Sequence, residues 1–159
     1  MFIDALGEVS VAQALSTAST IVSTNVIDLG VPGPNTGTQL FRQIGTGESV
    51  GFAVAIGVGA NYTANETYTI NIIESAAAAM SAPTILASLS ITAAQANAGV
   101  WAAGTLLFLQ MPIGQPTQEF IALQYVLAGT TPTITLTAWL TTRSLFSALA
   151  VAYPKSYVS

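Results

Sequence analysis

The sequence of 159 residues contains no cysteine and no histidine. It therefore lacks disulfides, thiolate nucleophiles, imidazole bases and the two residue types that most often bind zinc. Charged residues are also scarce, at 6% of the chain, against about 25% in an ordinary soluble domain. These absences exclude most catalytic chemistry and leave a surface that must be built from neutral side chains.

Positive charge is the rarest feature of all. Arg42, Arg143 and Lys155 are the only basic residues, and the net charge is −4. Binding to nucleic acid or to an anionic membrane surface depends on clustered lysine and arginine. We therefore expect no nucleic-acid partner and no membrane partner. The N-terminal segment carries Asp4 and Glu8 without a basic residue, so we do not expect a signal peptide.

Apolar residues make up 52% of the chain. A soluble monomer normally covers itself with charged side chains, so we expect much of this surface to be covered by partners. The uncharged stretch 75–118 is interrupted by proline and glycine, and its most apolar part, Val100–Met111, is shorter than the about 20 residues of a spanning helix. The expected partner is the chain itself, with a homodimer favoured over a homotrimer because two-fold closure is the commonest symmetry.

Alternation and β-branched residues predict an all-β chain. We expect about eight strands. Seven of them can be placed, at Ile21–Leu29, Val50–Val58, Tyr68–Ile72, Thr84–Ile91, Thr105–Met111, Phe120–Leu127 and Thr133–Leu140. Such short strands between turn signals are typical of an antiparallel β-sandwich or jelly roll. We expect a loop at residues 92–99 and at most one helical turn at 75–80.

The last two expected strands have the clearest pattern. Ile134, Leu136 and Ala138 alternate with threonines, so one face of the strand should be apolar and the other rich in threonine. Residues 128–132 contain a glycine and a proline, which predicts a turn. We expect these two strands to form an antiparallel hairpin.

The organisation predicted is one domain at residues 1–142 followed by a tail, residues 143–159. The segment Ser144–Ala152 is apolar at helical spacing. Apolar side chains gain nothing in water, so the tail should be buried, either against its own sandwich or, as we favour, against a neighbouring subunit or another protein. The candidate contact residues in this C-terminal extension are Arg143, Leu145, Phe146 and Leu149.

Few residues could carry catalysis. Glu66 and Glu74 could form a carboxylate pair for glycoside hydrolysis, but no other feature marks a substrate cleft. We expect no enzyme activity, no cofactor and no metal. A receptor- or glycan-binding β-module is the alternative to a structural protein, and it would need exposed aromatic side chains, for which Tyr62 and Tyr68 are the nearest pair.

Three charged residues, Asp28, Arg42 and Glu48, surround the proline- and glycine-rich segment 31–37. Two interpretations remain open. Arg42 could form an exposed ion pair of little energetic value, or a charge-assisted clamp that fixes the base of the loop or a subunit contact.

Four segments resemble capsid cement (decoration) proteins with a jelly-roll fold from short-tailed phages of the Bordetella-phage type. Residues 23–30, STNVIDLG, are similar to the family's ST-[ND]-VIDLG, and residues 42–48, RQIGTGE, to its R-x-I-G-x-G-E. Residues 81–88, SAPTILAS, are similar to its S-x-P-T-x-L-A-S, and residues 120–140 to its closing strands. The likeness covers residues 1–142; the proline-rich segment 31–41 is longer than expected and the tail is an addition.

The resemblance implies a virion protein on the outer surface of the capsid, made in the host cytoplasm. Such proteins bridge neighbouring major capsid proteins and stabilise the shell, usually as symmetric oligomers. The major capsid protein is thus an implied partner.

Overall fold

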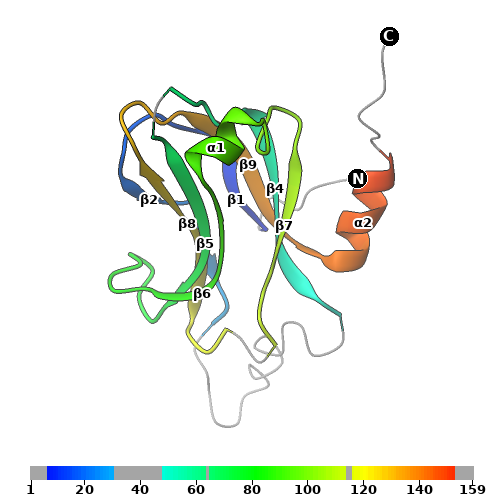
Figure 1. Ribbon diagram of the computed structural model, residues 1–159. Helices are drawn as coiled ribbons and strands as arrows, with labels where there is room; N and C mark the ends of the chain where they lie inside the picture. Colours follow the sequence, from blue (N-terminus) through cyan, green and yellow to red (C-terminus); the bar gives the residue numbers. More distant parts are fainter. Residues whose placement is uncertain (1–6, 31–47, 64, 114–115, 153–159) are drawn as a thin grey trace.

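The computed structural model describes residues 7–30, 48–63, 65–113 and 116–152, with residues 149–152 described by backbone alone. These ranges hold nine strands and two helices (Figure 1). They are β1 (Glu8–Leu15), β2 (Thr20–Val22), β3 (Ile27–Asp28), β4 (Val50–Val58), β5 (Thr67–Ser75), β6 (Thr84–Ile91), α1 (Ala93–Asn97), β7 (Leu106–Gln110), β8 (Phe120–Ala128), β9 (Ile134–Thr142) and α2 (Arg143–Ala152).

The strands form two antiparallel sheets packed face to face (Figure 1). One sheet has the order β1-β9-β4-β7, and the other has the order β2-β8-β5-β6 with β3 also paired to β8. With β2 and β3 counted as one interrupted strand, the first strand pairs with the last, the second with the last but one, and so on inward. This nested pairing is that of the jelly roll, which confirms the predicted fold class.

The predicted hairpin of the last two strands is wrong. β8 pairs with β5, whereas β9 pairs with β4 and β1 in the opposite sheet. The alternation in β9 is confirmed, since Ile134, Leu136 and Ala138 lie in the core. Alternation identifies the buried face of a strand but not its neighbour, and the connection through Gly129 crosses from one sheet to the other.

The N-terminal strands also differ from the prediction. β1 was not expected, because two register shifts and a positive φ of 44° at Ala12 break its alternation. The expected strand 21–29 is two short strands, β2 and β3. Between them the Ser23 hydroxyl donates to the Asn25 carbonyl at 2.8 Å, which is the local side-chain bonding that competes with a ladder.

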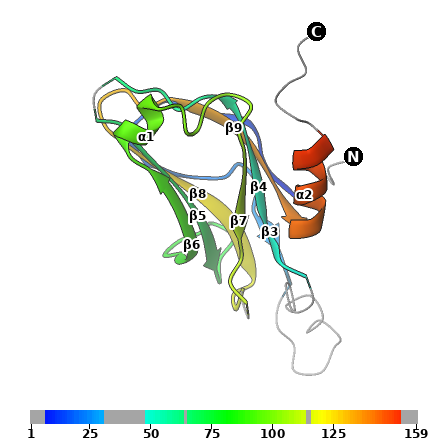
Figure 2. The same ribbon diagram turned by 45° about the vertical axis from the view of Figure 1, so that its right-hand side comes forward.

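The segment 92–99, expected as a loop, contains α1. A capping box begins this helix: the Thr92 hydroxyl accepts from the Gln95 N–H, and the Gln95 side chain accepts from the Thr92 N–H at 2.8 Å. α1 lies at one end of the sandwich (Figures 1 and 2) and buries Ala96. The alanines at 76–79 form exposed turns and no helix.

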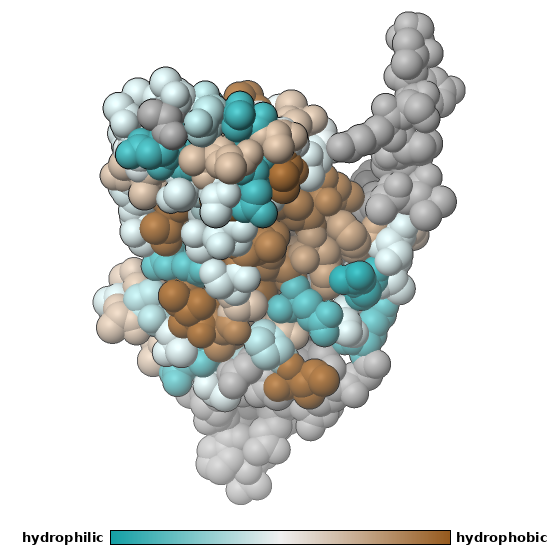
Figure 3. All heavy atoms as spheres, viewed as in Figure 1, coloured by the Kyte–Doolittle hydropathy of each residue, from teal (hydrophilic) through white to brown (hydrophobic). Residues whose placement is uncertain are grey.

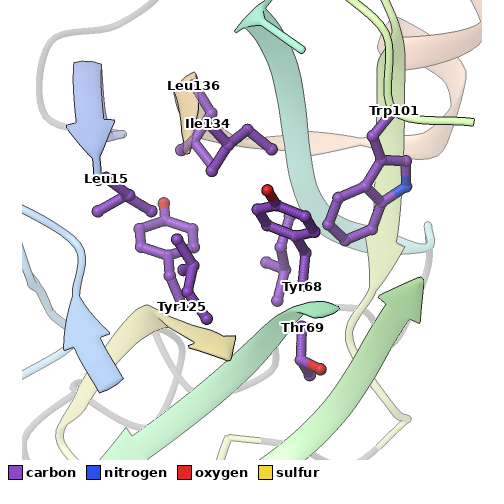
Figure 4. A pocket seen from close by; sticks show the side chains of 9 residues that line it. Leu15, Tyr68, Thr69, Trp101, Tyr125, Ile134 and Leu136 are labelled. Atoms are coloured by element: carbon purple, nitrogen blue, oxygen red, sulfur yellow. The ribbon is translucent and has the colours of Figure 1, made fainter. Parts of the chain in front are cut away.

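Two tyrosines cross the core from one sheet to the other (Figure 4). Tyr125 of β8 shares a 2.7 Å hydrogen bond with the Ser10 hydroxyl of β1, and Tyr68 of β5 donates to the Asn61 carbonyl at 2.9 Å. Burial raises the pKa of the Tyr125 hydroxyl. The cavity beside them has a volume of about 10 Å³, at the lower limit for one water molecule, so this part of the core is closed to ligands.

Candidate functional site

The junction between β9 and α2 brings two predicted site residues together. The Glu48 carboxylate accepts a 3.1 Å hydrogen bond from the Ser144 N–H in the first turn of α2, beside Arg143. An acidic group at the N-terminus of a helix interacts favourably with the positive end of the helix dipole. The side-chain hydrogen bond from Ser144 lowers the pKa of the Glu48 carboxyl.

Aromatic contacts hold α2 on the outer face of the β1-β9-β4-β7 sheet (Figure 2). The Phe146 and Phe108 rings lie 5.1 Å apart, and the Arg143 guanidinium carbon lies 5.3 Å from the centre of the Phe108 ring, within cation–π range. The first part of the tail therefore packs on the chain's own sheet, the less favoured of the two partners considered above. Leu145 stays 52% exposed.

One other predicted site residue, Asp28, is not part of this cluster. Asp28 is exposed, and its carboxylate accepts a 2.8 Å bond from the Gly30 N–H, which ends β3 in a local turn. Arg42 and the side chain of Leu149 lie outside the described residues. The charge-assisted clamp formed by Arg42 therefore stays a prediction.

The two carboxylates considered for glycoside hydrolysis lie at opposite ends of β5. Glu66 immediately precedes this strand and Glu74 is its last but one residue. Eight residues of strand span about 26 Å at 3.3 Å each, whereas paired catalytic carboxylates lie about 5–9.5 Å apart. These two residues therefore do not form a catalytic pair with each other.

Each of these buried carboxylates instead holds a loop. Glu74 is 4% exposed and accepts bonds from the Thr117 N–H at 2.6 Å and the Gln118 N–H at 3.0 Å. Glu66 is 0% exposed and accepts from the Thr63 N–H at 2.8 Å and the Thr131 N–H at 3.3 Å. The role of both carboxylates is therefore structural, because their hydrogen bonds hold neighbouring loops against the ends of β5.

In the part of the chain that the structure describes, neither the hollows, the potential metal ligands nor the exposed aromatic rings indicate a small-molecule site. A hollow of about 360 Å³ lies beside Glu74 and the loop after β5, but the carboxylate that it contains is engaged by the loop before β8. No group of three metal-ligating side chains occurs among the described residues. Tyr62 is 43% exposed and Tyr68 only 1%, so this pair forms no aromatic platform for a sugar.

Partly exposed apolar side chains occur on the side of the sandwich where β6 and β7 form the sheet edges. Ile85 is 55% exposed, and Leu86, Leu89 and Leu107 pack on the core while remaining partly exposed. We call these four residues and the two strands that carry them the β6–β7 side. Hydrophobic surface gathers between the two sheets in this view (Figure 3). No pattern in the sequence singles out these four residues, although the uncharged stretch 75–118 contains all of them.

The protein-family model described as Bbp16 matches residues 9–139. That range runs from β1 to β9 and leaves out α2. No curated protein matches. In the described residues, no helix has the length and apolar character required to cross a membrane.

Proposed function

The chain belongs to the Bbp16 family, a family of phage proteins, and on this premise we propose that it is a capsid cement protein. It binds the outer surface of the phage head, bridges neighbouring major capsid proteins and stabilises the shell. It works without catalysis, cofactor or metal. It associates with itself, as a dimer in preference to a trimer.

The observation that carries this proposal is an uncharged, apolar side on a jelly roll. Residues 75–118 contain no charge, and the β6–β7 side within them leaves apolar side chains partly exposed. Soluble monomers rarely expose large apolar patches unless a partner covers them. A protein whose apolar side is covered by neighbouring proteins on a capsid would have such a surface.

The same composition sets the physics of attachment. With so few charges, binding to the head rests on apolar burial and backbone hydrogen bonds. Raising salt from about 0.1 M to about 1 M shortens the screening length from about 10 Å to about 3 Å. Attachment should change little over that range.

Co-sedimentation with phage heads that lack this protein tests the proposal. Heads incubated with the purified chain should bind it to saturation at both salt concentrations, and should then resist heating better than bare heads. Absence of saturable binding would refute the cement function. Saturable binding that is lost at high salt would instead show that ion pairs provide the attachment.

The glycan-binding alternative makes a different forecast for the same protein. It requires binding to cell-surface sugars without any affinity for heads. Glycan binding depended on an exposed aromatic pair, and the burial of Tyr68 removes one of the two rings, because a buried ring cannot stack on a sugar.

A further inference from the structure

A jelly roll has four sheet edges, and three of them are guarded in this chain. β1 is broken by register shifts and carries Glu8. β2 and β3 are short and interrupted, and β3 ends at the charged Asp28. β7 has only five residues. Bulges, short length, charge and a covering element are the usual means of blocking an edge.

Among the edges that the described residues form, β6 is the least protected: its one register shift against β5 lies near its start, between the Ile73–Ile85 and Ile72–Ala87 pairs. It has eight residues, TILASLSI, with no charge and no proline. Its inner neighbour is β5, and from Ala87 to Ile91 the pairing is regular. In an antiparallel strand every second residue directs its N–H and C=O away from the neighbour, so β6 presents a row of backbone donors and acceptors beside the apolar side chains of the β6–β7 side.

We propose that β6 is the self-association edge, where it pairs antiparallel with β6 of a second copy about a two-fold axis. The two β2-β8-β5-β6 sheets then join into one continuous sheet across the dimer. The inference rests on the self-association in the proposed function and names the surface that performs it.

The composition of β6 selects a second copy as the occupant. An isologous pairing places residues near the axis opposite their own copies, so a charged residue there would face a like charge. Every β6 side chain is neutral. A partner recognised by opposite charge would find none to pair with on this strand.

Two features of the sheet suit this extension. Asn71 of β5 accepts from the Ser88 hydroxyl at 2.7 Å and donates to Gln124 of β8 at 3.0 Å. These bonds run across three strands and hold the outer face of the sheet next to the edge. Pairing at the edge would also cover Leu86 and Leu89, which the chain alone leaves partly exposed.

Disulfide trapping tests the proposed edge, because the chain has no cysteine of its own. Single cysteines are placed in turn at residues 85–90, and Val11→Cys, at a 61% exposed position on the guarded β1 edge, is the control. A disulfide needs Cα atoms about 4.4–6.8 Å apart, which a strand pair offers only to the residue on the axis facing its own copy. One position of β6 should form covalent dimers far faster than its neighbours and the control. Cross-linking no faster than Val11→Cys at every position would overturn the proposal.

Charge substitution gives a second readout that does not depend on disulfide geometry. Ile85→Lys and Ser90→Lys in one chain should raise the dimer dissociation constant by about tenfold or more, while Val11→Lys leaves it unchanged. A far-ultraviolet circular dichroism spectrum checks that each variant folds. Dimers that persist at the wild-type dissociation constant would show that another surface is used.

Head binding measured on the same variants separates the two proposals. If the wild-type chain does not bind heads, the cement function fails whatever the cross-links show. If it binds heads and dimerises without β6, only the interface is wrong. If the lysine variant stays dimeric but loses head binding, β6 serves the capsid protein, and the proposed self-association edge is refuted.

Discussion

Glu74 offers the sharpest test of how the loop before β8 is held. Its carboxylate accepts three hydrogen bonds, from the N–H groups of Thr117 and Gln118 at 2.6 and 3.0 Å and from the Thr117 hydroxyl at 3.0 Å. Hydrogen bonds to a charged group contribute about 1.5–3 kcal/mol each and neutral ones about 0.5–1.5 kcal/mol. The three bonds share one carboxylate, so their sum is smaller than three independent contributions.

The substitution Glu74→Gln keeps the shape and the acceptor for both N–H groups, and its amide can donate to the Thr117 hydroxyl. It removes the charge but also lowers the cost of burying the group. We expect the free energy of unfolding to fall by about 1–2 kcal/mol. Glu74→Ala removes all three acceptor contacts at a site that is 4% exposed, and should cost about 3 kcal/mol or more.

Urea unfolding measures both variants, with Glu119→Gln as the control that removes an equal charge from the same loop. The midpoint should fall in the order wild type, Glu74→Gln, Glu74→Ala, with an unchanged slope. If Glu74→Gln loses as much stability as Glu74→Ala, the charge and not the geometry carries the effect. If neither variant loses stability, the loop is held by other contacts and the reasoning is wrong.

Three further predictions concern β4, the core tyrosine and α2. Gly51→Ala would place its Cβ 2.0 Å from the Leu109 carbonyl oxygen, so β7 must separate from β4 and thermal unfolding should show a loss of about 2 kcal/mol or more. The raised pKa of Tyr125 means that the folded chain holds this proton when the unfolded chain has released it; stability should therefore be complete below about pH 10 and fall as pH rises above it, and Tyr125→Phe should flatten that fall in unfolding measured at several pH values. The lowered pKa of Glu48 has the opposite effect on stability: the hydrogen bond from Ser144 stabilises the folded chain above the ordinary carboxyl pKa of 4.5, and this stabilisation is lost as pH falls below that value. Glu48→Gln should therefore remove this loss of stability in acid. Equal acid unfolding profiles for the wild type and the variant would contradict a stabilising role of the Glu48–Ser144 bond.

The fold class was accessible from the sequence because it depends on a repeated local signal. Alternation along strands such as β9 records which side chains are buried. The partner of each strand is set by contacts far apart in the chain, which no local pattern records, and β8 and β9 were placed in one sheet for this reason. β1 was not predicted as a strand because the bulge at Ala12 disrupts the alternation on which the prediction depends.

The candidate site was predicted in part. Scarcity of charge pointed to Glu48, and the apolar tail pointed to Arg143. Arg143 begins α2, and Glu48 accepts a hydrogen bond from the first turn of that helix. The partner of each could not be predicted, because Ser144 and Phe108 meet them only through tertiary packing. The apolar character of the 75–118 stretch was visible in the sequence, but its meaning depends on β6 being an edge strand, and that is a property of the topology.

We propose above that this protein decorates the outside of the phage head. Electron microscopy of intact virions labelled with a gold-conjugated antibody against this chain tests it most directly. Gold should be distributed over the outer surface of the head and absent from the tail. Label confined to the tail or its fibres, or virions without label while the antibody recognises the purified chain, would contradict it.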